Sequence, residues 1–511
     1  MSADDDQAEV IKFFASGAAF EGHPVVRRID THGATVFLTA DRAWKLKRAV
    51  RFNYLDFSTA ARRRAVLETE LHLNRRTAPA LYRAVHPITR GADGDLHIGG
   101  SGAAVDWVLE MVRFPDGALL SEIVDQVGLA DELLLRLADH VVAFHRDAPI
   151  HQGDTGSTRF RRAVEGNVSS LAVVGDIFDP AMVATLVAGL RDATEHHAAL
   201  LDQRAVMGRV RHLHGDLHLH NIALIDGGPT PFDCLEFDED LATIDTLYDL
   251  AFLLMDLWHR DLHRAANLIF NRYLDLMAED EAGIALMPLF LALRATIRAH
   301  VMAQQAARHP DDPTLLAQAQ DFLALALHSL DPVKPRLIAV GGLSGSGKTT
   351  LAQALACDLG RAPGARLLRS DVLRKRLAGV APETRLGPAA YAKGSSTAVY
   401  AHLYALAAAA LGQQQAVIAD AVFALPKERA AIAAVGQQME VETVGIWLDS
   451  GEAMRVARVN ARFGDASDAD ATIAAAQSKI QVGPLADWRV LDATGGADEV
   501  ANRARRALGW G

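Results

Sequence analysis

The spacing of hydrophobic and polar residues divides the chain into a β-rich start, a helical middle and an α/β end. Residues 34–39 and 43–47 have the short apolar and β-branched pattern of strands. Apolar residues then recur at helical spacing over residues 119–201, 244–258 and 289–307. Short aliphatic runs return towards the C-terminus, where strands and helices are expected to alternate. The pattern therefore predicts a small sheet, a helical region and a separate α/β domain.

The small N-terminal sheet is predicted to be interrupted by one helix. Residues 58–76 form this arginine-rich predicted helix, and residues 85–88 and 105–111 add strands after it. The charged residues that bear on chemistry here are Lys45 and Lys47 on the second strand and Glu68 and Glu70 in the helix. Lysines within a strand commonly face solvent, so the pattern alone leaves their role open.

Length and composition fit a globular protein of two to four domains. The 511 residues are 50% hydrophobic and 23% charged, which is ordinary for such a chain. A net charge of −11 argues against binding of duplex nucleic acid, because that affinity comes from neutralising phosphates. The two distant cysteines, Cys234 and Cys357, match no disulfide or metal spacing, which favours a reducing, cytoplasmic compartment. The acidic N-terminus lacks the features of a signal peptide, and we expect no membrane partner.

The strongest chemical motif is Gly-Leu-Ser-Gly-Ser-Gly-Lys-Thr at residues 342–349, which fits the pattern G-x-x-x-x-G-K-[ST]. A predicted strand at 337–340 precedes it and a predicted helix at 350–356 follows it, as a phosphate cradle requires. Backbone N–H groups and the helix N-terminus would surround an anion there. We expect Lys348 to reach the terminal phosphates of a nucleotide and Thr349 to bind Mg²⁺. The predicted nucleotide-binding residues are Gly342, Ser344, Gly345, Ser346, Gly347, Lys348, Thr349 and Thr350.

A second motif lies between two helical regions, where His214-Gly215-Asp216 is followed by Asn221, a predicted hairpin and Asp233. Its histidines suggest zinc, but a zinc site needs three or four convergent ligands, and these alternate in a short loop without a nearby cysteine. Phosphoryl transfer explains more of the residues. Asp216 would accept the proton of a substrate hydroxyl, and Asn221 and Asp233 would hold Mg²⁺ that bridges nucleotide phosphates.

This second motif resembles the catalytic loop and metal-binding aspartate of the aminoglycoside phosphotransferase family. Asp249-Leu250-Ala251 matches a further signature of that family, for which we expect a structural role. The resemblance implies a kinase-like fold with a small β-rich lobe, a nucleotide site and a larger helical lobe. It also implies that Lys45 contacts the α- and β-phosphates and that Glu70 holds Lys45. The spacing leaves Lys47 and Glu68 as alternatives to these two residues.

The same resemblance places adenine at a hinge, for which Leu109-Glu110-Met111 is the candidate. One feature departs from the kinase pattern, because the small lobe has no G-x-G-x-x-G loop. His32-Gly33-Ala34 is the nearest substitute.

The C-terminal region resembles small-molecule P-loop kinases of the gluconate kinase and zeta-toxin-like types. Asp371, after the predicted strand 366–368, resembles the aspartate that faces the acceptor and is the predicted base. The alternative for Asp371 is a helix N-cap. Arg374 would bind an anionic group of the substrate or the transferred phosphate. Asp420 ends the predicted buried strand 416–420, as in a Walker B strand, and is the predicted partner of Mg²⁺.

Three arginines follow the next predicted strand of this region. Arg455, Arg458 and Arg462 fall near one face of a helix. They resemble the arginine-bearing lid of nucleoside-monophosphate-kinase-like enzymes, and Arg458 is expected at the nucleotide. The alternative is a solvated helix face.

The sequence thus predicts an α+β bilobal kinase-like domain followed by an α/β P-loop NTPase domain with a parallel sheet. The predicted boundaries are 1–112 for the small lobe, 113–330 for the helical lobe with the catalytic loop, 331–336 for a linker and 337–511 for the P-loop kinase domain.

The expected function is ATP- and Mg²⁺-dependent transfer of a γ-phosphate, at two nucleotide sites, to a hydroxyl of a small molecule such as a sugar or amino sugar. Two alternatives remain open. In the first, one domain binds nucleotide only to regulate the other. In the second, the acceptor is a protein side chain or a nucleic-acid end.

Overall fold

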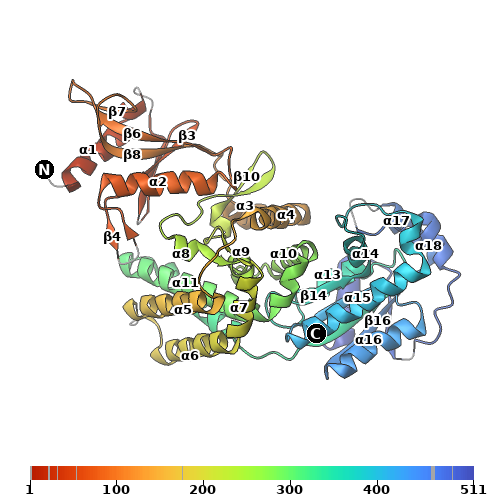
Figure 1. Cartoon of the computed structure of the whole chain (residues 1–511). Coiled ribbons are helices and arrows are strands. Elements are labelled where there is room, and N and C mark those ends of the chain that lie inside the picture. Colours follow the sequence, from red (N-terminus) through yellow and green to blue (C-terminus); the bar gives the residue numbers. More distant parts are fainter. Residues whose placement is uncertain are drawn as a thin grey trace. The chain divides into compact units, whose positions relative to one another are not determined.

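The computed structural model describes residues 3–20, 24–31, 33–52, 55–174, 177–461, 466–485 and 487–510. The chain forms two compact units (Figure 1). The first unit combines residues 1–159 with residues 201–253, and the second combines residues 160–200 with residues 254–511. The chain passes between the units within helices α5, α7 and α9. The domain boundaries proposed from the sequence stay a prediction.

The first unit begins with a six-stranded antiparallel sheet in the order β1-β2-β3-β8-β6-β7. Its strands are β1 (Arg27–Asp30), β2 (Ala34–Leu38), β3 (Arg42–Lys47), β6 (Tyr82–Arg90), β7 (Leu96–Ile98) and β8 (Ala103–Val112). Helix α2 (Ala60–Asn74) packs against β6 and β8 through Leu67 and Leu109, which are fully buried (Figure 1). The Thr59 side chain caps this helix by accepting from the Arg62 N–H. The predicted order of strands and helix in this region is confirmed.

The remainder of the first unit consists of short strands and helices. Its helices are α1 (Ala3–Ala15), α3 (Leu120–Val127), α4 (Asp131–Asp147), α7 (Ala198–Val206), α8 (Glu239–Ala242) and α9 (Thr246–His259). Its short strands are β4 (Arg51–Phe52), β5 (Leu55–Asp56), β9 (Val210–His212), β10 (Ile222–Ile225), β11 (Gly228–Pro231) and β12 (Thr243–Asp245). Strands β10 and β11 form the predicted hairpin, which separates Asn221 from Asp233.

The second unit contains a five-stranded parallel sheet in the order β14-β15-β13-β16-β17. Its strands are β13 (Arg336–Gly341), β14 (Arg366–Arg369), β15 (Val417–Asp420), β16 (Glu442–Asp449) and β17 (Trp488–Asp492). Its surrounding helices are α13 (Lys348–Ala356), α14 (Ser370–Leu377), α15 (Lys393–Gly412), α16 (Pro426–Gln438), α17 (Glu452–Asn460), α18 (Ala471–Gln477) and α19 (Ala497–Leu508). The predicted α/β domain with a parallel sheet is confirmed.

The central strands β13 and β15 of this sheet are buried on both faces, which explains their long apolar runs. Ile338 and Val340 face one hydrophobic cluster, to which α13 and α19 contribute. Leu337 and Ala339, which point to the opposite face, belong to a second cluster with residues of α15 and α16. The central strand β13 is therefore fixed on both sides and delivers the loop at residues 342–347 to a defined place.

The second unit also contains helices from the middle of the chain. They are α5 (Gly156–Val173), α6 (Pro180–His196), α10 (His263–Leu276), α11 (Met287–Arg308) and α12 (Pro313–Ser329), with a 3₁₀ segment, η4, at Ala278–Leu286. One segment of the described chain, Ala278–Arg308, is long and apolar enough to cross a membrane. Its most apolar window is 72% buried, as in a core helix.

Helix α10 covers the open edge of the parallel sheet. Strand β14 is an edge strand, and its free backbone groups need partners. The Asn271 amide pairs with two backbone groups at this edge, because its oxygen accepts from Leu367 N at 2.7 Å and its nitrogen donates to Ala365 O, just before the strand, at 3.1 Å. One turn earlier, Asn267 donates to the same Ala365 oxygen at 2.9 Å. Asparagine side chains of helix α10 thus make hydrogen bonds to the backbone at the edge where a further strand could otherwise pair.

The same edge contains a fully buried arginine. Arg366 pairs with Asp275 of α10 at 2.8 Å and with Glu281 of η4 at 2.6 Å. Removing one partner of a buried ion pair leaves the other charges without compensation, which costs about 3–5 kcal/mol. We therefore expect Arg366→Met to lower the free energy of unfolding of the full chain by about this amount, as measured by urea denaturation.

The matched control is Arg336→Met. Arg336 is the first residue of β13 and pairs with the largely exposed Glu442 at 2.6 Å. Surface ion pairs contribute about 0–1 kcal/mol, so this variant should unfold almost as the parent does. Equal effects of the two substitutions would show that the buried pairs of Arg366 do not hold this edge.

Candidate active sites

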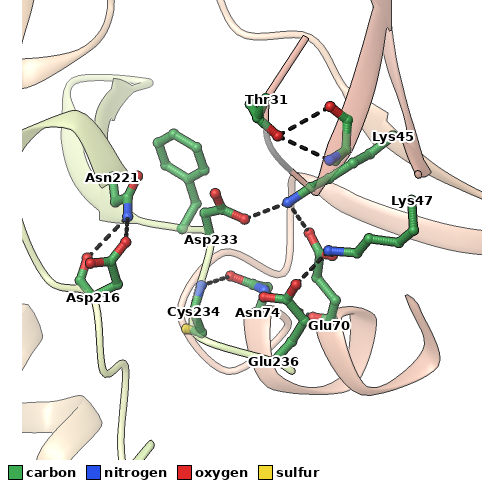
Figure 2. A network of polar contacts seen from close by, with 12 residues as sticks. Thr31, Lys45, Lys47, Glu70, Asn74, Asp216, Asn221, Asp233, Cys234 and Glu236 are labelled. Atoms are coloured by element: carbon green, nitrogen blue, oxygen red, sulfur yellow. Dashed lines mark hydrogen bonds and ion pairs between the residues drawn. The ribbon is translucent and has the colours of Figure 1, made fainter. Parts of the chain in front are cut away.

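The N-terminal site is built around two lysines of strand β3. Residues i and i+2 of a strand point to the same face, so Lys45 and Lys47 lie side by side. Lys45 Nζ contacts Glu70 Oε1 at 2.7 Å and Asp233 Oδ1 at 2.6 Å, and Lys47 Nζ lies 2.7 Å from Glu70 Oε2 (Figure 2). Lys47 also pairs with Glu236. The structure thus brings both candidate lysines to Glu70.

The two candidate glutamates of helix α2 have different surroundings. The Glu70 side chain is fully buried between the two lysines. Glu68 pairs with Arg64 at 2.8 Å, and half of its side-chain surface is exposed to solvent. Only Glu70 of the two therefore contacts the lysines of β3.

The charged groups of this cluster shift one another's pKa values. Burial alone would lower the pKa of Lys45, but Asp233 and Glu70 raise it well above its ordinary value. Burial would raise the pKa of Asp233, yet Lys45 and Lys47 hold it below its ordinary value. Burial dominates for Glu236 and raises its pKa, although Lys47 acts in the opposite direction. At neutral pH Lys45 is therefore charged, and Asp233 is a carboxylate.

The predicted catalytic loop is held by a buried carboxylate from helix α9. Asp249, which is fully buried, accepts from His214 N at 3.2 Å and from Gly215 N at 2.9 Å. Its side chain also pairs with His145 Nε2 at 3.1 Å. Gly215 has φ = +78°, a conformation that glycine adopts without strain. Asp249 thus sets the backbone that presents Asp216.

Asp216 and Asn221 are joined at the end of this loop. Asn221 Nδ2 donates to Asp216 Oδ2 at 2.8 Å and to the Asp216 carbonyl at 3.0 Å (Figure 2). These bonds fix the amide and turn Asn221 Oδ1 away from Asp216. Because 42% of the Asp216 side chain is exposed, it is accessible to a substrate.

The donor set of this site fits a magnesium ion. Mg²⁺ prefers oxygen ligands and is commonly bound by one or two carboxylates together with substrate phosphates. The Asp233 carboxylate, 39% exposed, and Asn221 Oδ1 are the oxygens that would hold it. Asp233 has φ = +62°, and its N–H donates to Tyr82 Oη at 3.1 Å, which fixes the direction of its side chain.

The expected hinge strand contains an additional charged contact. Glu110 in β8 pairs with Arg42 at 3.0 Å and with His86 at 2.8 Å. Gly33 of the substitute for a glycine loop is described, but His32 lies outside the described residues. The roles given to these residues stay predictions.

The C-terminal site begins at the loop between β13 and α13. Gly345 has φ = +84°, and a Cβ there would come within 2.4 Å of the Arg455 carbonyl oxygen, so the position needs glycine. Lys348 Nζ donates to Leu343 O at 3.1 Å across the loop. The predicted loop residues Gly342, Ser344, Ser346 and Gly347 lie in this turn, and the exposed Thr350 follows in the first turn of α13.

Thr349 and Asp420 meet beside this loop. Strand β15 runs parallel to β13 with Asp420 opposite Val340, and the Thr349 hydroxyl donates to Asp420 Oδ2 at 2.6 Å. Burial raises the pKa of Asp420, although Lys348 and Arg369 oppose the shift. A hydroxyl and a carboxylate in contact provide the oxygen ligands that suit Mg²⁺. These two residues therefore fit the predicted metal site.

Asp371 is the second residue of helix α14, whose N-cap is Arg369. It is therefore not the N-cap that the sequence left as an alternative. Its charge helps to raise the pKa of the nearby Tyr391, after the larger contributions of burial and of Asp468. Arg374 donates to Ala390 O at 2.6 Å, and its guanidinium lies 4.6 Å from the centre of the Tyr391 ring.

The arginines of helix α17 bond to backbone carbonyls. Arg458 donates to Ser346 O at 3.3 Å and to Ala493 O at 3.0 Å, and Arg455 donates to Ala474 O at 2.9 Å. Both side chains contact protein, so this face is not solvated as the alternative supposed. Arg462 lies outside the described residues.

Several residues of both sites carry no signal in the sequence. Asp468 accepts from Lys375 at 2.5 Å and from Tyr391 Oη at 2.6 Å, and Gln477 accepts from the P-loop amide Ser344 N at 2.7 Å. In the N-terminal site the same is true of Asn74, Tyr82 and Glu236. Each meets its partner through distant chain segments, so no spacing could have identified it.

Residues 337–482 match the family model described as an AAA domain. The match begins at the strand that precedes the P-loop. It confirms the P-loop nucleotide-binding fold that the sequence predicts for this segment.

Relatives from two Mycobacterium species match nearly the whole chain. An uncharacterized protein of Mycobacterium tuberculosis (strain H37Rv) is 29% identical over 503 residues, which cover 95% of this chain and 94% of that protein. An uncharacterized protein of Mycobacterium bovis matches with the same values. The N-terminal and C-terminal regions therefore occur together in these relatives.

Some solved structures resemble one part of the chain, and others resemble the other part. A gluconokinase from Sinorhizobium meliloti 1021 is 18% identical with a TM-score of 0.26, and the match covers 34% of this chain and 92% of the gluconokinase. A choline kinase from Cryptosporidium parvum Iowa II is 9% identical with a TM-score of 0.38, over 59% of this chain and 88% of the choline kinase. Because these scores lie below 0.5, the fold assignment rests on the topology and the site geometry above.

Proposed function

We propose that this protein is an ATP- and Mg²⁺-dependent phosphotransferase with two nucleotide sites, each of which transfers a γ-phosphoryl group to a hydroxyl of a small molecule. The observation that carries the proposal is the presence of two separate sets of phosphate-handling groups. One set is the Lys45–Glu70–Asp233 cluster beside Asp216 and Asn221. The other is the P-loop with its Thr349–Asp420 pair. The expected compartment is the cytoplasm.

At the N-terminal site each residue has one role in the proposed reaction. Lys45 would bind the α- and β-phosphates while Glu70 holds its ammonium group in place. Asn221 and Asp233 would hold Mg²⁺, which neutralises the charge of the phosphates. Asp216 would accept the proton of the attacking hydroxyl, because its carboxylate is accessible and its direction is set by Asn221.

At the C-terminal site the backbone N–H groups of the P-loop would surround the phosphates, and Lys348 would neutralise the β- and γ-phosphates. Thr349 and Asp420 would hold Mg²⁺. Asp371, near the start of α14, is the proposed base for the acceptor. Arg458, which donates to Ser346 O of the P-loop, would act at the nucleotide.

Calorimetric titration of the full chain with the non-hydrolysable analogue AMP-PNP in Mg²⁺ tests the proposal. We expect a stoichiometry of two. Lys348→Ala should remove one site, and Lys45→Ala should remove the other, because each lysine supplies the charge that attracts phosphate at one site only. The double variant should bind no nucleotide.

Other outcomes would overturn specific parts of the proposal. A stoichiometry of one that persists after Lys348→Ala would mean that the P-loop is not an occupied site. A stoichiometry of one that falls to zero with that substitution would mean that the N-terminal site binds no nucleotide. If two sites bind but only one domain turns over ATP, the other domain is a regulator.

A further inference from the structure

The four residues from Asp233 to Glu236 are each held by a different element of the first unit. Asp233 N donates to Tyr82 Oη of β6, and Cys234 N donates to Asn74 Oδ1 of α2 at 2.9 Å. Leu235 N donates to His214 O of the catalytic loop at 2.8 Å. The fourth residue, Glu236, is held by its side chain, which pairs with Lys47 of β3 (Figure 2).

Lys47, the partner of Glu236, is buried and contacts a second carboxylate as well. Its side chain is only 3% exposed, and its ammonium group bridges the carboxylates of Glu70 and Glu236. The ammonium group also lies 5.5 Å from the centre of the Phe57 ring. On the backbone side, the Lys47 carbonyl accepts from Gln7 Nε2 at 2.8 Å. Lys47 is therefore fixed at both ends.

The two lysines of this cluster have different roles in the proposed reaction. In the proposed reaction Lys45 contacts phosphates and Asp233 contacts Mg²⁺, so their mutual contact at 2.6 Å must be exchanged for new partners. Glu70 faces each lysine with a different oxygen, so it can remain paired with both during this exchange. The Lys47–Glu236 pair has no part in phosphate binding, so it remains closed during the exchange.

We propose that Lys47 and Glu236 are positioning residues of the N-terminal site. Their ion pair anchors the segment 233–236 to strand β3, so that Asp233 keeps its direction when Lys45 leaves it for the nucleotide. This inference rests on the proposed function of Asp233 and Lys45. The pair acts on the metal through Asp233 and touches neither metal nor nucleotide.

The test measures AMP-PNP affinity by calorimetry, once with Mg²⁺ and once with EDTA, in the full chain carrying Lys348→Ala. Lys47→Met and Glu236→Gln should each weaken binding in Mg²⁺ by about 10-fold, an effect of the size found between residues of one ion-pair network. Affinity in EDTA should hardly change. The double variant Lys47→Met/Glu236→Gln should be no weaker than the weaker single variant, because neither charge is left buried alone.

The control is Glu9→Gln, which breaks an exposed ion pair with Arg90 in the same region and should leave both affinities unchanged. If both single variants lose affinity equally in Mg²⁺ and in EDTA, the pair is only structural and the inference is wrong. Additive losses in the double variant would also overturn it.

Failure of the proposed function gives a different pattern. In that case Mg²⁺ would not strengthen binding in the Lys348→Ala parent, or Asp233→Asn would leave the Mg²⁺ effect intact. If the Mg²⁺ effect is present and depends on Asp233, but survives in Lys47→Met and Glu236→Gln, only the positioning role fails. Thermal unfolding of each metal-free variant identifies any that do not fold.

Discussion

Lys348→Ala is expected to lower ATP turnover at the C-terminal site by 100-fold or more. The Lys348 ammonium group donates to the Leu343 carbonyl at 3.1 Å, a bond that it can exchange for phosphate oxygens. Its loss removes positive charge where negative charge develops in the transition state, at a cost of about 3 kcal/mol or more. The measurement is ADP release in a mixture of hydroxyl-bearing metabolites.

The substitution has to be made in the full chain with Asp216→Asn, so that the N-terminal site does not contribute to turnover. An isolated segment from about residue 332 is a poor alternative, because it would expose the edge of β14 and leave Arg366 buried without Asp275 and Glu281. Lys427→Ala, on the exposed surface of α16, is the control and should keep full turnover. Unchanged kcat in Lys348→Ala would refute the assignment of the P-loop.

The strand, glycine turn and helix of the P-loop could be predicted because they are local in the sequence. Strand, glycine turn and helix follow one another over residues 336–356, and backbone groups make most of the site. Asp216 and Asn221 could likewise be identified together, because they lie five positions apart in one loop. In both places the sequence specifies the contacts directly.

Contacts between segments that lie far apart in the chain could not be predicted from the sequence. The alternation of a strand placed Lys45 and Lys47 on one face, but it did not show that Glu70 accepts both while Glu68 turns to Arg64. The hydrogen bond between Asn271 and the backbone of β14 joins positions almost 100 residues apart. Asparagine is also an ordinary residue for an exposed helix, so its presence in α10 gives no signal. Such pairings depend on how helices and sheets pack, which short-range patterns do not encode.

Substitutions of Asp216 and Asp233, two carboxylates of the N-terminal site, should have clearly different effects on binding and transfer. Asp216→Asn keeps the shape of the side chain and its bond to Asn221, and removes only the proton acceptor. Phosphoryl transfer by this site should fall about 10²–10⁴-fold, the usual contribution of general acid–base catalysis. Affinity for AMP-PNP in Mg²⁺ should hardly change. The background carries Lys348→Ala, so that the P-loop site cannot mask the loss.

Asp233→Asn should behave differently, because it removes a negative charge from the metal as well as the partner of Lys45. Nucleotide affinity in Mg²⁺ should fall together with turnover, whereas affinity in EDTA should hold or rise, since Lys45 is released to the phosphates. If Asp216→Asn weakens Mg²⁺-dependent binding as much as Asp233→Asn does, the roles of base and metal ligand are exchanged or shared. If neither substitution alters binding or transfer, residues 1–330 do not form a kinase site, whatever the P-loop domain does.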